Sequence, residues 1–266
     1  MSDTKKNILF VISTYTLFWG LFLIVGILGM LGLLSLEGNA MQVGVVIGSW
    51  TPTFTLIIFF KKFFPDDTLS AFFKRAFKER LDGKLLLAVT AIQLLIFVLT
   101  VCCIAFTRQI NISNLLNFSL PTLGMAVLWT ATQGASGEEA GWRGFLQPSL
   151  QKKHSFLKSS LLVGLVWSFW HGILWLTSGY VGWDLLQYSV SFLIMCTSAA
   201  VIFAICHERC HNLLVPMWIH FMFNFPLKFF VGEPDDLLMV ISWFAGFYAL
   251  AAVGFYLWRQ KKSKHA

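Results

Sequence analysis

Long apolar segments constrain the fold of this chain more than any other feature. A helix that crosses the hydrocarbon core of a bilayer needs about 20 mostly apolar residues. Eight such segments occur, near 8–35, 41–60, 85–107, 121–142, 159–178, 184–205, 212–231 and 237–258. Hydrophobic residues make up 57% of the sequence and charged residues only 12%. We therefore predict an all-α, polytopic membrane bundle of about eight transmembrane helices.

The positions of lysine and arginine predict how this bundle is oriented. Basic flanks of transmembrane segments stay on the cytoplasmic side. If Lys5 and Lys6 are cytoplasmic, eight crossings place 18 of the 20 Lys and Arg residues inside, up to the tail from Arg259 to Lys264. Only Arg108 and Lys228 then lie outside. Both termini are therefore expected in the cytoplasm of a multi-pass protein of the cell membrane, with a bacterial cytoplasmic membrane favoured.

The same topology accounts for the net charge of +7. No nucleic-acid partner is needed to explain it, and a basic stripe that binds nucleic acid is the weaker interpretation. No linker, low-complexity tract or internal repeat divides the sequence, so residues 1–266 are expected to form a single integral-membrane domain. The first apolar segment is longer than a signal-peptide core and is expected to be an uncleaved anchor.

Cysteine and histidine gather in "CHERCH", residues 206–211. Cys206 and Cys210, like His207 and His211, are four residues apart, and zinc accepts both residue types. The segment also falls at a predicted helix end, where His and Arg complement the helix dipole. A capping role is favoured over a metal site. The five cysteines lie mostly inside predicted spans and do not suggest a disulfide framework.

The segment "GASGEEAGWRGFL", residues 134–146, places three charges in an apolar stretch. An ionisable residue in the membrane interior costs roughly 2.5–3.5 kcal/mol by insertion scales and marks a functional candidate. Glu139 and Arg143 are four residues apart, so they share a helix face and can form an ion pair. Glu138 then has no charge partner on its own helix and is free to act as a base. Alternatively, the three charges mark only the cytoplasmic end of a helix.

Glycines at positions 134, 137, 141 and 144 of this segment are small enough to let neighbouring helices approach. Two other predicted spans could then bring polar groups to Glu138. "VWSFWHGILW" (166–175) contains His171, and "PMWIHFMFNF" (216–225) contains His220 and Asn224, which share a helix face. A lone histidine in such a span more often bonds to a neighbouring helix. Three spans with such groups favour a convergent site.

These residues are sufficient for peptide-bond hydrolysis without a covalent nucleophile. Glu138 and His171 could hold and deprotonate a water molecule. Donors from His220 and Asn224 could stabilise the developing oxyanion.

Three motifs resemble those of the CPBP family of intramembrane endopeptidases. They are "EEAGWR" at 138–143, His171 with an aromatic residue four positions earlier, and "HFMFN" at 220–224. The family is also labelled Abi or CAAX-protease-like, and it includes type II CAAX prenyl endopeptidases and bacteriocin-processing or self-immunity proteins. The resemblance covers roughly residues 120–230, the expected catalytic core. One departure is Trp167, where the family usually has Phe.

The resemblance implies a proteolytic cavity inside the bilayer and a peptide or membrane-anchored protein as substrate. In the family the first Glu of the pair, here Glu138, activates water with His171, while His220 and Asn224 stabilise the oxyanion. The second Glu and the Arg of the first motif correspond to Glu139 and Arg143. The candidate catalytic residues are thus Glu138, Glu139, Arg143, His171, His220 and Asn224.

Two alternatives for the chemistry of this site stay open. A zinc ion held by Glu138, His171 and His220 would make the protein a metalloendopeptidase, but no stretch has the HExxH spacing. The glutamate mechanism, with no cofactor, is favoured. A non-catalytic immunity or regulatory protein could use the same cavity to bind a peptide or a membrane partner. A transporter is disfavoured because neither an inverted repeat nor a pair of broken helices is visible in the sequence.

Overall fold

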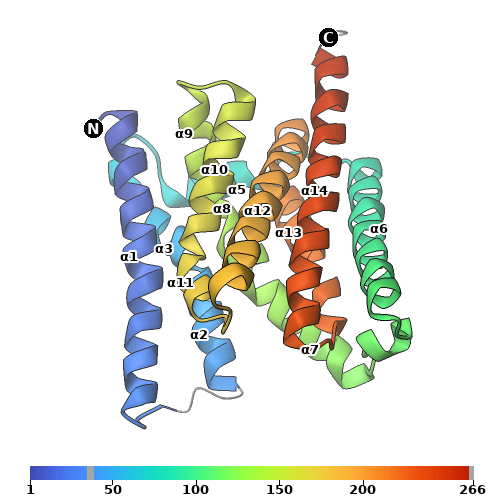
Figure 1. The fold of residues 1–266 in the computed structure, drawn as a ribbon. Helices are drawn as coiled ribbons and strands as arrows, with labels where there is room; N and C mark the ends of the chain where they lie inside the picture. Colours follow the sequence, from blue (N-terminus) through green and yellow to red (C-terminus); the bar gives the residue numbers. More distant parts are fainter. Residues whose placement is uncertain (35–38, 264–266) are drawn as a thin grey trace.

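A computed structural model describes residues 1–34 and 39–263 of the chain (Figure 1). Over these ranges the backbone forms helices joined by short connections, and an isolated bridge pairs Leu116 with Phe230. The predicted all-α class is therefore confirmed for the described part. Residue 35, the predicted end of the first apolar segment, and Lys264 of the basic tail lie outside the described residues.

Four helices of the described chain are long and apolar enough to cross a bilayer. They are α1 (Asp3–Met30), α6 (Gly83–Arg108), α12 (Gly182–Cys210) and α14 (Pro234–Ser263). The side chains of Ser2 and Asp82 accept hydrogen bonds from backbone N–H groups in the first turns of α1 and α6, which fixes where these helices begin. The count of eight spans and the side of the membrane on which the termini lie stay predictions.

The other four predicted spans are interrupted. They comprise α2 (Asn39–Ser49), α3 (Thr51–Ile58) and α4 (Phe60–Phe63); α7 (Leu120–Thr130), η2 (Ala131–Ala135), α8 (Glu139–Gly141), η3 (Trp142–Leu146) and α9 (Gln147–Gln151); α10 (Phe156–Trp170) and α11 (Gly172–Leu176); and α13 (Leu214–Asn224) and η4 (Pro226–Phe229). Gln133 leaves the helical conformation with φ −81° and ψ −145°. Such breaks were not visible in the sequence, because hydrophobicity alone does not report them.

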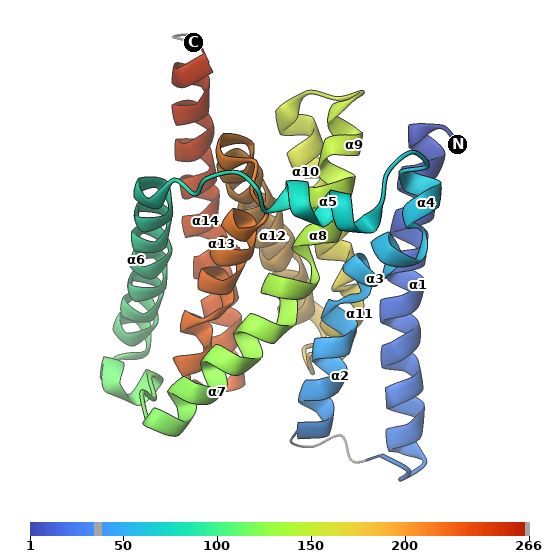
Figure 2. The ribbon, with the colours of Figure 1, turned by 180° about the vertical axis from the view of Figure 1, so that it is seen from behind.

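Both ends of the described chain lie at the same end of the bundle (Figures 1 and 2). The short helix α5 (Leu69–Ala76) and the connection between α9 and α10 lie toward this end too, whereas η1 (Ile112–Leu115) and the start of α7 lie at the opposite end. The segments richest in Lys and Arg thus gather at one end, as the positive-inside pattern requires.

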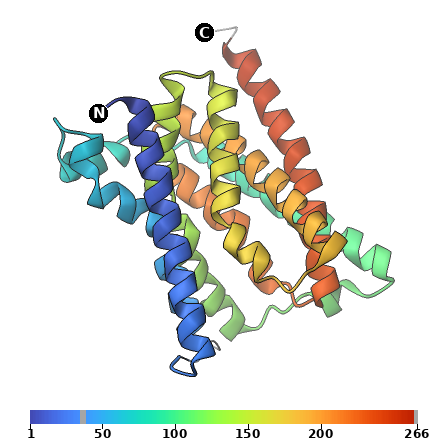
Figure 3. The same cartoon turned by 60° about the vertical axis from the view of Figure 1, so that its left-hand side comes forward.

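Helix α12 packs between α10 and α14 at the centre of the bundle (Figure 1). Small side chains permit this packing: a methyl group on Gly164 of α10 would lie 2.6 Å from the Cα of Thr197 in α12. Helix α1 lies on the other side of α10 (Figure 3), where the Tyr15 hydroxyl donates to Val166 O at 2.6 Å and Trp19 Nε1 donates to Trp170 O at 2.8 Å.

The glycines of the charged segment lie at close contacts, as predicted. A Cβ on Gly137 would lie 2.8 Å from the carbonyl oxygen of Ser49, and one on Gly141 would lie 2.8 Å from that of Pro52. Since real Cβ atoms do not approach backbone so closely, both positions require glycine for α8 to pack on α2 and α3. This packing fixes the positions of Glu138, which precedes α8, and of Glu139, at which α8 begins.

Candidate active site

Glu138 is buried, with 3% of its surface exposed, and two indole groups hold one of its oxygens. Trp142 Nε1 donates to Glu138 Oε2 at 3.2 Å, and Trp167 Nε1 donates to the same oxygen at 2.5 Å. Trp142 is one helical turn after Glu138, whereas Trp167 comes from α10. Both donors bind Oε2, so the carboxylate has a fixed orientation and Oε1 accepts none of these bonds.

Glu139 turns away from Glu138 into a fully buried ion pair. Arg143 Nη1 lies 3.1 Å from Glu139 Oε1, and neither side chain is exposed to solvent. The predicted ion pair is therefore present. The Arg143 guanidinium also lies over the rings of Trp167, at 5.1 Å, and Phe203, at 4.7 Å, so aromatic faces replace part of its hydration.

The same oxygen of Glu139 binds His220, which sequence reasoning did not foresee. His220 Nδ1 lies 2.7 Å from Glu139 Oε1, although the two residues are 81 positions apart. A carboxylate at one ring nitrogen fixes the orientation of an imidazole and leaves the other nitrogen for chemistry. Nε2 of His220 can then donate when the ring is protonated and accept when it is neutral.

His171 lies at the junction of α10 and α11. Its backbone N–H donates to Ser168 O at 3.0 Å, which is a tighter turn than the regular helical bond to Trp167 O. The carbonyl of Trp167 instead pairs with the His171 ring, at 2.8 Å from Nδ1. Because a carbonyl only accepts, Nδ1 carries the hydrogen and Nε2 has a free lone pair.

Gly134 lies between the free atoms of Glu138 and His220. A Cβ at this position would lie 2.6 Å from His220 Nε2 and 2.7 Å from Glu138 Oε1. Both atoms therefore face the same small volume above the Gly134 backbone. The non-helical conformation at Gln133, one residue earlier, is what turns this part of the chain toward α13.

A cavity of about 300 Å³ contains these groups. Four of the six predicted site residues line it, namely Glu138, His171, His220 and Asn224. Glu139 and Arg143 do not line the cavity. Arg143 contacts Glu139, and Glu139 in turn contacts His220, which lines the cavity. The remaining wall is largely apolar and includes Phe and Trp side chains. The structure thus separates the six residues into four that can face a ligand and two that support them.

Several residues at this cavity were not among the predicted set. Trp142 and Trp167 bind Glu138. Trp142 is four residues after Glu138 and Trp167 is four residues before His171, and this spacing is the signal that could have identified them. Lys228 and Gln133 also line the cavity, with Lys228 Nζ 3.5 Å from Gln133 Oε1. Their positions depend on the broken helices η2 and η4, which the apolar pattern does not reveal.

The donor atoms are not arranged as a metal site in the described part of the chain. No group of three or more His, Cys, Asp or Glu side chains there is placed to hold a metal ion. Glu138 Oε2 is taken by two indoles and His171 Nδ1 by a carbonyl, which leaves one atom of each residue facing the cavity.

"CHERCH" forms the last turn of α12 and its end. Cys206 and Cys210 are buried free thiols, and Cys102, Cys103 and Cys196 are free thiols as well. His211 ends the helix in the left-handed conformation with φ 48°, and His207 and Arg209 lie in the last turn. This arrangement agrees with the favoured capping role.

The comparisons with known proteins cover the part of the chain that contains these residues. Residues 118–226 match the family model described as "Type II CAAX prenyl endopeptidase Rce1-like". A stretch of 112 residues is 30% identical to "CAAX prenyl protease 2" of Methanococcus maripaludis. That match spans 40% of this chain and 41% of the curated relative, so less than half of either protein is compared. The resemblance to the CPBP family that the three motifs indicate is thereby confirmed for this segment.

Proposed function

We propose that this protein is an intramembrane endopeptidase that hydrolyses a peptide bond of a membrane-associated protein or peptide. The observation that carries the proposal is the arrangement around Gly134, where Glu138 Oε1 and His220 Nε2 face one point in a cavity with a mostly apolar lining. A base and an electrophilic group that converge on one small volume meet the geometric requirement for activated water and a polarised carbonyl.

In the proposed first step, Glu138 and His171 position a water molecule. The indole bonds to Oε2 leave Glu138 Oε1 to accept a proton from water, and Nε2 of His171 has the lone pair to accept the second hydrogen. The resulting hydroxide attacks the carbonyl carbon of the scissile bond. The water proton then resides on Glu138.

In the second step, the oxyanion that forms is stabilised by donors from α13. His220 in its protonated form donates from Nε2, because Glu139 already occupies Nδ1. Asn224 follows one helical turn later, lines the same cavity and donates from its amide. Collapse of the intermediate breaks the C–N bond, and the proton held by Glu138 passes to the leaving amine.

We propose that this chemistry proceeds without a metal ion. Glu138, His171 and His220 each offer one free atom to the cavity, but the other atoms are fixed by indoles, a carbonyl and a carboxylate in orientations that suit hydrogen bonding to water and substrate. Cleavage should therefore persist after exhaustive chelation. Loss of cleavage on chelation, with rescue by zinc, would contradict this part of the proposal.

The proposed topology has eight crossings and both termini in the cytoplasm of the cell that makes the protein. Support comes from the position of both chain ends and of the basic segments at one end of the bundle (Figure 1). The curated relative is named a prenyl protease, so a prenylated peptide with a CAAX sequence is the first substrate class to test.

The test uses the full chain reconstituted in vesicles with a farnesylated CAAX peptide. Glu138→Gln, His171→Ala and His220→Ala should each lower the rate of cleavage by about 100-fold or more, the usual effect of losing general acid–base catalysis. Glu233→Gln and His154→Ala are matched controls outside the cavity and should retain the wild-type rate. Wild-type cleavage by all three cavity variants would refute the site assignment.

The same variants distinguish catalysis from binding. Glu138→Gln keeps the size and shape of the side chain but removes the base. If cells that lack the protein are rescued by Glu138→Gln as well as by the wild type, the protein acts as a non-catalytic binding module. An endopeptidase requires that this variant fails to rescue.

A further inference from the structure

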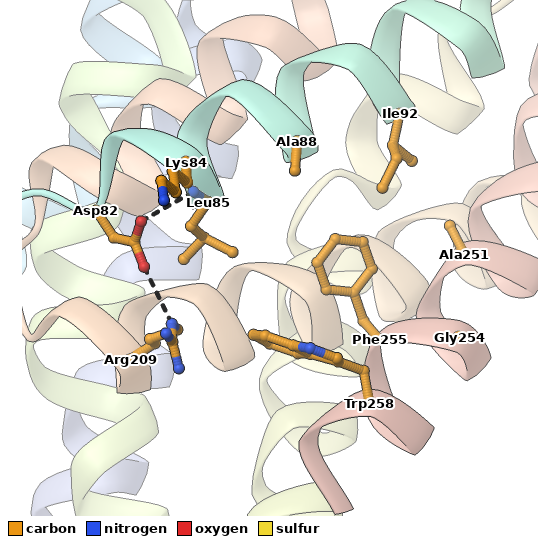
Figure 4. A pocket seen from close by; sticks show the side chains of 10 residues that line it. All are labelled: Asp82, Lys84, Leu85, Ala88, Ile92, Arg209, Ala251, Gly254, Phe255 and Trp258. Carbon is orange, nitrogen blue, oxygen red and sulfur yellow. Dashed lines mark hydrogen bonds and ion pairs between the residues drawn. The ribbon is translucent and has the colours of Figure 1, made fainter. Parts of the chain in front are cut away.

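A second cavity lies between α6 and α14, away from the catalytic residues (Figure 4). Its volume is about 530 Å³, within the range of small-molecule and lipid sites. None of its lining residues also lines the catalytic cavity among the described residues. Buried Gln93 lies behind this groove, where its amide donates to Ile219 O at 3.0 Å and to the Tyr248 hydroxyl at 3.2 Å.

The walls of the groove are apolar and leave open space. Ala88 and Ile92 of α6 face Ala251 and Phe255 of α14 across it (Figure 4). A Cβ at Gly254 would meet nothing within 4 Å. The groove is therefore open because small residues lie on both helices, and among the described residues no side chain fills the space next to Gly254.

The rim of the groove is charged at one end only. Asp82 caps α6 and accepts a hydrogen bond from Arg209 Nε at 3.2 Å, and Lys84 follows two residues later on the rim. Arg209 and Lys262 lie on Trp258, at 5.5 and 5.4 Å from its ring. The Leu85 amide and Arg209 lower the pKa of Asp82, so this carboxylate stays ionised at neutral pH. Three cations and one anion leave a net positive rim.

The depth of the groove matches one leaflet of a bilayer. From Lys84 to Ile92 the helix rises about 12 Å at 1.5 Å per residue. Half of a hydrocarbon core is about 15 Å thick. The charged rim lies toward the end of the bundle that contains both termini (Figure 1). A ligand that fits must combine a negative head with an apolar chain of about this length.

We propose that this groove binds an anionic phospholipid of the leaflet that faces the chain termini. Its phosphate would lie at Lys84, Arg209 and Lys262, and one acyl chain would lie along Ala88 and Phe255. Complementary charge favours this ligand over a neutral prenyl chain, which would leave the cationic rim without a counter-charge. The inference does not depend on the proposed peptidase activity.

The test measures lipid binding to the purified full chain by native mass spectrometry, with phosphatidylglycerol and phosphatidylcholine as probes. A basic residue near a membrane surface is worth about 1 kcal/mol, or about fivefold in affinity. With a net charge of two at the rim, phosphatidylglycerol should bind roughly 25-fold more tightly. Lys84→Gln should weaken its binding about fivefold, whereas Lys78→Gln, an exposed lysine outside the groove, should not.

A second pair of variants tests the apolar part of the site. Gly254→Leu places a side chain in the open groove and should abolish tight phosphatidylglycerol binding. Gly246→Leu makes the same change on the same helix, also in open space but outside the groove, and should bind lipid like the wild type. Equal thermal unfolding of the two variants would show that the helix itself is intact.

Any of three results would overturn the proposal, and the second and third concern the choice of ligand. The first is phosphatidylglycerol binding by Gly254→Leu that equals that of Gly246→Leu. The second is equal affinity for the two lipids. The third is displacement of phosphatidylglycerol by a neutral farnesyl probe at lower concentration, which would assign the groove to a prenyl chain.

Discussion

Replacing Gly134 by alanine tests the proposed catalytic geometry without removing any catalytic side chain. The new Cβ would lie 2.6 Å from His220 Nε2 and 2.7 Å from Glu138 Oε1, whereas ordinary contacts begin near 3.4 Å. Each atom must therefore move by roughly 0.7 Å or more. Neither can simply rotate away, because Trp167 holds the other Glu138 oxygen and Glu139 holds the other nitrogen of His220.

The expected magnitude follows from this displacement. A misplacement of about 1 Å in a catalytic group can cost 100-fold in rate, or about 2.7 kcal/mol in the activation barrier. Stability should change little, because the atoms that clash are side-chain termini and an alanine in a helix is about 0.5–1 kcal/mol more favourable than glycine. The variant should thus lose cleavage while it stays folded.

The assay compares Gly134→Ala with Gly124→Ala in reconstituted vesicles, by cleavage rate and by thermal unfolding in detergent. Gly124 lies in the preceding helix α7 with open space around it, so its variant controls for the substitution itself. A Gly134→Ala protein that cleaves at the rate of the control would refute the inference that Glu138 Oε1 and His220 Nε2 act together. A large loss of stability would show that the clash spreads beyond the site.

Three further predictions concern the residues around the site. Gly141→Ala forces a Cβ against the backbone of α3, which cannot rotate away, so thermal unfolding in detergent should occur at a lower temperature than for Gly134→Ala. Arg143→Met leaves Glu139 with His220 as its remaining buried partner and should destabilise the protein by about 3–5 kcal/mol, while the double variant with Glu139→Gln should recover part of this loss in the same measurement. Trp167→Phe removes one donor to Glu138 but keeps the aromatic wall; about 1.5 kcal/mol, or tenfold in kcat, should be lost with little change in KM.

Local spacing predicted the part of the site that lies on one helix. Glu139 and Arg143 are four residues apart, and the pair forms as expected because such spacing brings side chains together in any helix. The convergence of His171, His220 and Asn224 on the cavity of Glu138 was also expected, from the polar groups in three apolar spans.

The detailed partners of these residues could not be predicted, since they depend on contacts between helices. His220 was expected to act with Asn224 alone, yet its ring binds Glu139 on a different helix. Glu138 was expected to have no charge partner on its own helix; the two indoles that bind it were not foreseen. A sequence pattern gives the face of a helix and not its rotation against neighbours.

The breaks in the apolar spans occur next to the proposed catalytic residues. Gln133 is non-helical one residue before Gly134, α10 ends at Trp170 with His171 as its C-cap, and α13 ends at Asn224. At membrane depth, irregular backbone is tolerated where it is buried in protein or lines a cavity. Hydropathy averages over these points, so a site of this kind appears in the sequence only as isolated polar residues.

The two adjacent glutamates have opposite arrangements of their oxygens. Both indoles bind Glu138 Oε2, which leaves Oε1 at the cavity, whereas Arg143 and His220 both bind Glu139 Oε1. A buried ion pair contributes little net stability but fixes the orientation of what it contacts. Glu139 and Arg143 are therefore best understood as the support that aims His220 at the point faced by Glu138. The two neighbouring carboxylates can then have different roles, because α10 supplies Trp167 to Glu138 and α13 supplies His220 to Glu139.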